Sequence, residues 1–373
     1  MARRLFWLVP DHPTDLNLNN KGGRIMRLSR ILSVLFATHL TLLMSCGGDT
    51  EGELIGAVER GDVSSFEALL EEGADVNTQL GNRKTILMLA AEKGQLELVR
   101  LLVDKGAEIR VKDFDGWSAL LYAAKEGHGE TWRLLLEAGA QPDEQTSSGR
   151  TSLSFAAENG VVAMIELLIE KAVDINAEDV TKRTALTYAA EKNHADVVQL
   201  FLDSGAEVDA RDYDNLTALL YAAENGHTEV VQLLLRKDAS IHASPDDGQN
   251  ALIRAAQNGH ANSVQVLLDQ GAAIGSRDKA NRTALIRAAE NGHIEVVELL
   301  LSKGADLNAL GNTEKTALTW AAMGGHTDLV QVLLGKRASV NTRDVDGWTA
   351  LKWATSKDHV EVAQLLTEAG ATE

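Results

Sequence analysis

Apolar and small residues recur along the chain with a period of 33 residues. Each copy begins with a Thr, Ser or Asn, which we call its start residue; Leu follows two positions later and Ala five positions later. A start residue of this kind can cap the helix that follows it, and the Leu and Ala then lie on one side of that helix. The nine start residues are Thr85, Ser118, Thr151, Thr184, Thr217, Asn250, Thr283, Thr316 and Thr349.

A Gly about nine positions after the start residue, such as Gly94, is expected to end the first helix. A second apolar stretch with helical spacing follows, for example residues 230–235, and a Gly-Ala-Asp-Val-Asn turn such as 73–77 leads into a hairpin-like finger. No copy has enough apolar surface for a core of its own, so its stability must come from stacking on its neighbours. The pattern predicts an all-α solenoid of about ten helix-turn-helix repeats over residues 53–373, with polar copies at both ends.

These features resemble the ankyrin repeat, which has a 33-residue period, a T-P-L-H-x-A-A start and a G-A-D-V-N-A close. The segment 283–308 matches that pattern nearly throughout, and the resemblance covers about 320 residues. The Pro after the Thr is Ala in seven of the nine copies, and the His three positions after the Thr is absent. The resemblance implies a scaffold that binds proteins through a variable surface, because the fold alone does not set the function.

The first 52 residues follow another pattern. Arg27 and Arg30 precede an apolar stretch of 14 residues, 31–44, which is shorter than the roughly 20 residues of a membrane-spanning helix and has the size of a signal-peptide core. The stretch ends at Leu43-Met44-Ser45-Cys46, which resembles the lipobox of bacterial lipoproteins. An uncleaved apolar tail with an incidental Cys is the alternative.

The lipobox resemblance implies that residues 1–45 are removed, that Cys46 is lipidated, and that residues 46–52 form a tether. We expect translation to begin at Met26, since Asp11 and Asp15 do not fit a signal peptide. Gly47 stands where the family's inner-membrane signal is an Asp, which implies an outer-membrane anchor facing the periplasm. A secreted protein is the second choice.

Composition and charge argue against several functions. The chain has 36 basic and 54 acidic residues, a net charge of −18, whereas a nucleic-acid binder needs clustered Lys and Arg. One Cys excludes an intrachain disulfide. We find no catalytic or phosphate-binding motif, and expect neither an enzyme nor a cofactor.

Two patterns could indicate metal sites, and we interpret both as structural. Histidines recur ten residues after most start residues: His128, His194, His227, His260, His293, His326 and His359. They lie a repeat apart, roughly 8–10 Å, whereas the ligands of one ion lie about 2 Å from it. Residues 113–116 and 344–347 look like the openings of calcium loops but lack the Glu at the twelfth position, so we predict finger turns.

The fourth residue after each start residue, here called position four, varies and is rich in aromatic residues and Arg. On a helical wheel it points away from the Leu and Ala face, and in the ankyrin family that side lines the concave face. Finger tips and residues before the start add further aromatic and basic side chains, the types that dominate binding hot spots. The predicted partner-binding residues are Phe114, Trp117, Tyr122, Phe155, Tyr188, Tyr213, Tyr221, Arg254, Arg282, Arg287, Trp320, Trp348 and Trp353.

Two interpretations of this row remain open. The aromatic residues from Tyr122 to Tyr221 can bind a partner or pack on the same position of the next repeat. Our hypothesis is a monomeric scaffold that holds a protein or an extended peptide, with Arg254, Arg282 and Arg287 pairing with its carboxylates. The alternative is a secreted effector that binds or inhibits a foreign enzyme.

Overall fold

The computed structural model describes residues 50–373, which form twenty α-helices arranged as ten consecutive pairs. Residues 54–373 belong to one compact unit. The first helix begins at Thr50, three residues before the predicted start of the repeats at 53. The predictions for residues 1–45 and for Cys46 lie outside the described residues. Among the described helices, none combines the length and the apolar character needed to cross a membrane.

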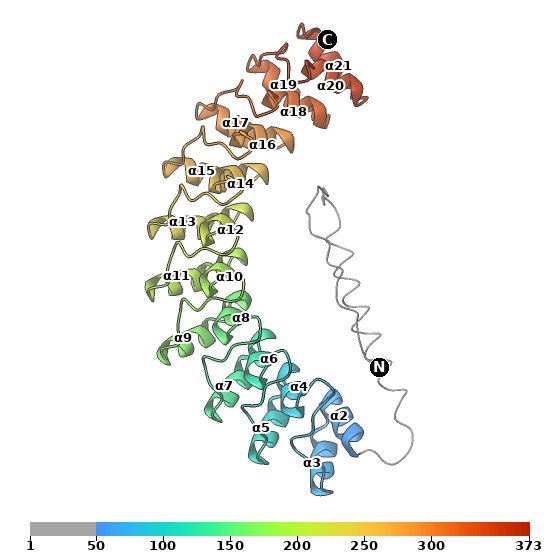
Figure 1. The fold of residues 1–373 in the computed structure, drawn as a ribbon, viewed down its shortest axis with the longest axis vertical. Helices are drawn as coiled ribbons and strands as arrows, with labels where there is room; N and C mark the ends of the chain where they lie inside the picture. Colours follow the sequence, from blue (N-terminus) through green and yellow to red (C-terminus); the bar gives the residue numbers. More distant parts are fainter. Residues whose placement is uncertain (1–49) are drawn as a thin grey trace, which may run out of the picture. The chain divides into compact units, whose positions relative to one another are not determined.

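Each pair consists of an inner helix with an even number and an outer helix with an odd number, on the inner and outer sides of a curved stack (Figure 1). The inner helices are α2 (Thr50–Arg60), α4 (Ile86–Glu92), α6 (Ala119–Lys125), α8 (Ser152–Asn159), α10 (Ala185–Glu191), α12 (Ala218–Glu224), α14 (Ala251–Gln257), α16 (Ala284–Glu290), α18 (Ala317–Gly324) and α20 (Ala350–Ser356). The outer helices are α3 (Val63–Glu71), α5 (Leu96–Asp104), α7 (Gly129–Glu137), α9 (Val162–Glu170), α11 (Ala195–Asp203), α13 (Thr228–Arg236), α15 (Ala261–Asp269), α17 (Ile294–Ser302), α19 (Thr327–Gly335) and α21 (Val360–Glu368).

The start residues cap the inner helices as predicted in seven of the nine copies. In α16, for example, the Thr283 hydroxyl accepts from the Ile286 amide, which satisfies an amide that has no partner inside the helix. Thr184 and Thr217 make no such bond, and the Thr184 hydroxyl lies 3.2 Å from that of Thr187 instead. The start residue therefore caps most inner helices, while α10 and α12 form without a cap from its side chain.

The core consists of the Leu and Ala positions predicted from the period. Ala90, Ala123 and Ala156 are fully buried, and so is Leu120. Ala at these positions allows neighbouring inner helices to approach closely at little cost in side-chain entropy. The helices therefore shelter one another's apolar faces, as the stacking argument requires.

The recurring histidines join each repeat to the one before it. The Nε2 atom of His128 lies 3.0 Å from the Glu92 carbonyl oxygen, and the same bond, always 36 residues apart, recurs at the other six. In six of the seven repeats the His ring lies against a glycine that has positive φ; a Cβ on Gly94, for example, would fall 2.6 Å from the His128 Nδ1. These contacts confirm the predicted structural role.

The repeat of Thr151 has Val161 in place of this His. There Asn159 donates from Nδ2 to the Lys125 carbonyl oxygen at 2.8 Å, and Lys125 occupies the same position in its repeat as Glu92 does in its own. An amide side chain thus replaces the imidazole in joining the two repeats.

The free energy of unfolding should fall in mild acid because of His293. Burial lowers the pKa of His293 below 6.5, and the neighbouring His260 and His326 act in the same direction, against the bond to the Gln257 carbonyl. A lowered folded-state pKa means that the unfolded chain binds the proton more tightly, so stability is present above about 6.5 and is lost as the pH falls below it. Thermal unfolding of a His293→Gln variant between pH 8 and 5 should show a weaker pH dependence, whereas His242→Gln, at an exposed loop residue, should match the wild type.

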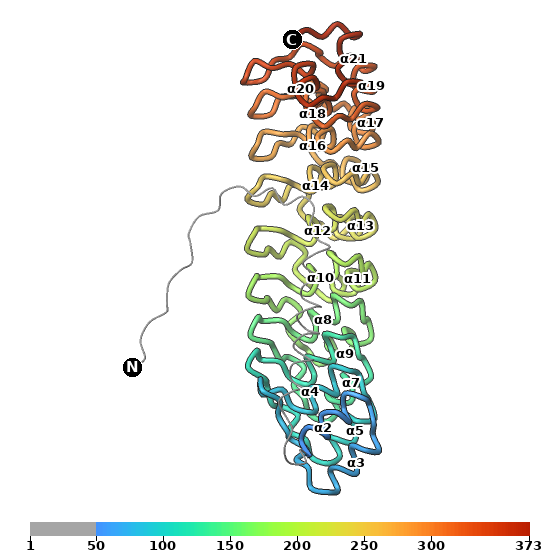
Figure 2. The backbone as a smooth tube through the Cα atoms, turned by 90° about the vertical axis from the view of Figure 1, so that its right-hand side faces the viewer, coloured from blue at the N-terminus to red at the C-terminus, as the bar shows by residue number. Residues whose placement is uncertain are grey.

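The fingers form a third layer beside the two layers of helices (Figure 2). In each of several fingers a carboxylate folds the turn: the Asp113 Oδ1 accepts from the amides of Asp115 and Trp117 at 3.0 and 2.9 Å. Successive fingers are joined backbone to backbone, as where the Phe114 amide donates to the Asn82 carbonyl at 3.2 Å. Residues 50–373 contain isolated β-bridges but no strand, so the fingers are hairpin-like, as predicted.

Candidate functional site: the concave face

Position four is more buried than the helical wheel predicts. Tyr122, Phe155 and Tyr188 are only 8%, 4% and 7% exposed, and the remaining aromatic and Arg residues of the row are half-buried. The wheel considers the inner helix alone, whereas the fingers and the basic residues that precede the start residues cover this side. These three aromatic residues therefore leave little surface accessible to a partner, and their role in binding stays a prediction.

A carboxylate in the finger holds position four in five of the repeats. This residue, here called the finger carboxylate, lies five positions before the start residue and nine before position four. The Tyr122 hydroxyl donates to the Asp113 Oδ2 at 2.7 Å, and the Trp353 Nε1 donates to the Asp344 Oδ2 at 2.7 Å. The other three pairs are Tyr188 with Asp179, Tyr221 with Asp212, and Arg287 with Asp278. Each such bond ties a finger to its own inner helix.

Burial and the bond to the carboxylate change the ionisation of these tyrosines. Burial raises the pKa of Tyr188 to about 12, and its hydrogen bond to Asp179 acts in the same direction. Burial and the bond to Asp113 likewise raise the pKa of Tyr122. The tyrosines therefore stay protonated and act as hydrogen-bond donors, so this arrangement gives them no role as general bases.

Every finger carboxylate has a hydrogen-bond donor at position four, whereas the donors Arg254 and Trp320 have Pro245 and Gly311 in place of the carboxylate. Where the carboxylate is replaced by Leu80 or Thr146, position four is Leu89 or Phe155, which have no donor. The Trp320 Nε1 is buried without a hydrogen-bond partner, and the residue nine positions before Trp320 is Gly311, which has no side chain to accept from it. The pairing was missed in the sequence, although its spacing of nine residues could have revealed it.

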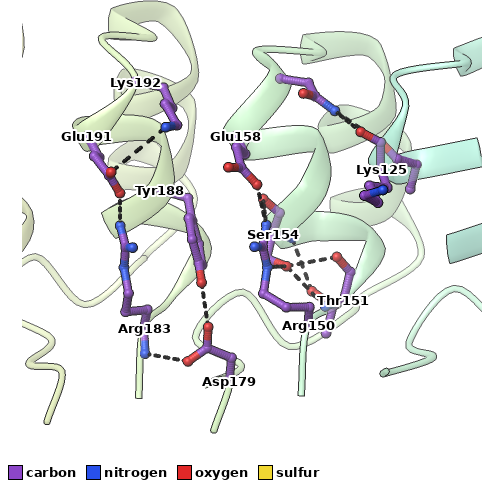
Figure 3. A network of polar contacts seen from close by, with 12 residues as sticks. Lys125, Arg150, Thr151, Ser154, Glu158, Asp179, Arg183, Tyr188, Glu191 and Lys192 are labelled. Carbon is purple, nitrogen blue, oxygen red and sulfur yellow. Dashed lines mark hydrogen bonds and ion pairs between the residues drawn. The ribbon is translucent and has the colours of Figure 1, made fainter. Parts of the chain in front are cut away.

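Basic residues lie between the aromatic rings of consecutive repeats. The Arg150 guanidinium is 4.3 Å from the Phe155 ring centroid and 3.9 Å from that of Tyr188, and it donates to Glu158 at 2.6 Å (Figure 3). Arg183 lies likewise between Tyr188 and Tyr221 and pairs with Glu191. Such stacking on a ring face is attractive and strengthens as the cation loses water. Rings and cations therefore alternate as a ladder from Tyr122 to Tyr221 and again from Trp320 to Trp353, while Arg254 and Arg287 between them pair with carboxylates.

The three arginines predicted to meet carboxylates of a partner already have carboxylates of this chain. Arg254 pairs with Glu224 and Asp247, Arg282 with Glu290, and Arg287 with Asp278 and Glu290. Arg282 also lies 4.3 Å from the Trp320 ring centroid. A partner would have to break these pairs to use the arginines, and their role in binding stays a prediction.

The predicted finger-tip residues differ in exposure. Phe114 and Tyr213 are 68% and 65% exposed, whereas Trp117 and Trp348 are half-buried. The Trp117 ring stacks 5.2 Å from that of Phe155, and the Trp348 ring lies 4.6 Å from that of Trp353. The structure thus places both tryptophans against position four and leaves the other two rings accessible.

A cavity of about 560 Å³ opens on the opposite side, between α5, α7 and α9. Apolar residues, including Leu96, Trp132 and Met164, line it together with Arg100 and Arg133 and two glutamates. Its lining contains no Ser, Thr, Cys, Lys, His or Tyr, so the two glutamates are its only side chains of the types that act as nucleophiles. Within residues 50–373, no three His, Cys, Asp or Glu side chains are placed to hold a metal ion.

The paired helices, the stacking through His and Ala, and the ladder along the inner helices define a helical-repeat solenoid whose modules present a continuous surface. A family model described as "Ankyrin repeats (3 copies)" matches residues 54–146, 133–212, 153–245, 219–311 and 309–372. The chain belongs to the ankyrin-repeat family, and membership indicates a scaffold for protein–protein interactions. A comparison with curated proteins finds no match.

Proposed function

We propose that the concave face and its finger tips hold a protein or an extended peptide, with Phe114 and Tyr213 as anchors. The observation that carries this proposal is the exposure of these two rings, 68% and 65%, beside a row whose other aromatic residues are packed. Exposed aromatic side chains cost free energy in water and dominate binding hot spots. Arg83 and Lys182 lie 5.9 and 5.5 Å from the Phe114 and Tyr213 ring centroids, so each anchor has a cation beside it.

The double variant Phe114→Ala/Tyr213→Ala should lose partner capture and unfold at the same temperature as the wild type. Both rings are exposed, so their removal takes little from the core. Crosslinking in extracts of the native cell, followed by mass spectrometry, measures capture. The matched control is Val360→Ala, an apolar residue 76% exposed on the last outer helix, which should retain capture. Undiminished capture by the double variant would show that the anchors lie elsewhere.

We also propose that the scaffold is anchored as a monomer in the outer membrane, facing the periplasm, through lipid on Cys46. The support is the resemblance of residues 43–46 to a lipobox and the signal-like stretch before them. A diacylated terminus holds a soluble domain firmly, since each buried CH₂ contributes about 0.8 kcal/mol. The alternative is a secreted effector that binds or inhibits a foreign enzyme.

Metabolic labelling with palmitate decides between the two. Cys46 is the only cysteine in the chain, so label that disappears in a Cys46→Ser variant reports this site alone. We expect a labelled wild type in the membrane fraction and an unlabelled variant. Unlabelled wild-type protein recovered from the culture medium would favour the effector.

A further inference from the structure

The finger that precedes the repeat of Asn250 differs from its neighbours in the bond that closes its turn. In the fingers on either side, the Asp212 amide donates to the Leu216 carbonyl at 3.1 Å and the Asp278 amide to the Arg282 carbonyl at 3.0 Å. The corresponding residue here is Pro245, which has no amide hydrogen to donate. This finger therefore lacks both the closing bond and the finger carboxylate.

The same finger also interrupts the backbone bonds that join one finger to the next. The Tyr213 amide donates to the Thr181 carbonyl at 3.1 Å, and the Lys279 amide to the Asp247 carbonyl at 3.0 Å. Asp246, the corresponding residue between them, makes no backbone bond to the preceding finger. The Asn215 Nδ2 donates to the Asp246 Oδ1 at 3.0 Å instead, in an exposed position. Water competes for such a contact, which contributes less than a sheltered backbone bond.

Position four of this repeat compensates by reaching across the joint. Without a carboxylate at 245, the Arg254 guanidinium pairs with Asp247 at 2.8 Å in its own finger and with Glu224 at 2.5 Å in the preceding repeat. Both carboxylates are partly exposed, 46% and 41%, so salt screens these pairs. The finger layer is therefore held here by contacts that each involve a side chain.

The two helical layers continue unbroken past the same joint. Leu252 and Ile253 are 1% and 0% exposed. His260 bonds to the Glu224 carbonyl at 2.9 Å, and the hydroxyls of Thr228 and Ser263 lie 3.0 Å apart. The helical side of the joint is thus packed and bonded, while the finger side lacks the backbone–backbone bond and is joined through side chains, among them the Asp209 carboxylate, which accepts from the Ser240 amide at 2.9 Å.

We propose that the joint between the repeats of Thr217 and Asn250 is a hinge. The fingers on either side separate and close again while the inner and outer helices stay packed, so the solenoid bends at this point as two bodies. Small motions of packed helices about a continuous contact are a known form of hinge and shear movement. Opening changes the curvature of the concave face, which lets one scaffold fit surfaces of different shape.

Distances between spin labels test the hinge in the full chain carrying Cys46→Ser. One pair, Glu166→Cys and Glu298→Cys, spans four repeats and crosses the joint. The control pair, Arg100→Cys and Gln232→Cys, also spans four repeats and ends before the joint. All four residues are exposed and lie at the same position of their outer helices, and four repeats give roughly 40 Å. Double electron–electron resonance should give a broader distance distribution for the crossing pair.

The variant Pro245→Asp restores both missing features, an amide hydrogen and a carboxylate placed to meet Arg254 as Asp278 meets Arg287. In this variant, the distance distribution of the pair that crosses the joint should narrow to the width seen for the control pair, whose own distribution should not change. Pro245→Ala restores the amide alone and should narrow the distribution of the crossing pair in part. Two results would overturn the proposal: equal widths of the two distance distributions in the chain that keeps Pro245, or a distribution for the crossing pair that stays broad in Pro245→Asp. Neither result depends on a partner, so the hinge is tested apart from the proposed binding.

Discussion

Replacing Asp344 by Ala should destabilise the C-terminal end of the solenoid by about 3–5 kcal/mol. The Asp344 side chain is fully buried and accepts from the Lys315 Nζ at 2.9 Å and the Trp353 Nε1 at 2.7 Å. It also accepts from the Trp348 amide at 2.8 Å. Lys315 itself is 7% exposed, so the substitution leaves a buried ammonium group without its counter-charge, which is the costly outcome for a buried pair.

Denaturant unfolding of Asp344→Ala measures the loss of free energy of unfolding. Because each repeat depends on its neighbours, the last repeats should open first, and limited proteolysis shows whether they do. Asp346→Ala is the matched control, since that carboxylate is exposed and lies two residues away. The double variant Asp344→Ala/Lys315→Met removes both charges and should recover part of the loss. If Asp344→Ala unfolds like its control, the pair contributes nothing.

The same contacts predict acid sensitivity. Burial alone would raise the pKa of Asp344, but the hydrogen bonds from Lys315 and Trp353 outweigh it and hold that pKa below 3.8. A lowered pKa in the folded state contributes stability above 3.8 that is lost as the pH falls through the folded-state value. When the free energy of unfolding is measured against pH, the difference between the wild type and Asp344→Ala should therefore shrink as the pH falls below 3.8.

The repeat architecture could be predicted from the sequence because its signals are local. A Thr, a Leu two positions later and an Ala five positions later define one helix without reference to the rest of the chain, and the 33-residue period then fixes which helices are equivalent. Ala90 and its equivalents are buried as this pattern requires. The capping residue begins the helix, the small residue lets the next helix approach, and the glycine ends the helix, so these local signals all favour the same stacked fold.

The contacts of position four could not be predicted in the same way, because they join separate segments. The helical wheel places Tyr122 on the outward side of its helix, but the finger folds back so that Asp113 reaches the hydroxyl. Arg150 lies between rings of two repeats, which requires knowing how far apart the repeats stack. Exposure at the finger tips depends on the same packing, and so Trp117 and Phe114 could not be distinguished beforehand.

Adding the missing finger carboxylate, Gly311→Asp, should stabilise the protein by about 2 kcal/mol. The backbone at Gly311 already has the geometry of the carboxylate-bearing fingers. Its amide donates to the Lys315 carbonyl and its carbonyl accepts from Glu314, as at Asp344. A Cβ would meet its nearest atoms at 3.4 Å, an ordinary contact. The new carboxylate would accept from the buried Trp320 Nε1, which has no partner, and the unfolded chain would lose the freedom of a glycine.

Two controls separate these contributions. Gly275→Asp lies in an exposed turn with open space around its Cβ and an ordinary φ, so it reports the effect of losing a glycine and adding a charge without the new bond. Gly311→Asp in a Trp320→Phe background lacks the donor, and there we expect the gain to shrink to that of Gly275→Asp. Thermal and denaturant unfolding measure the free energy of unfolding of the wild type, Gly311→Asp, Gly275→Asp, Trp320→Phe and the double variant Gly311→Asp/Trp320→Phe. A gain that persists without the Trp320 donor would mean that the finger carboxylate acts on the turn alone, and that its pairing with position four contributes no stability.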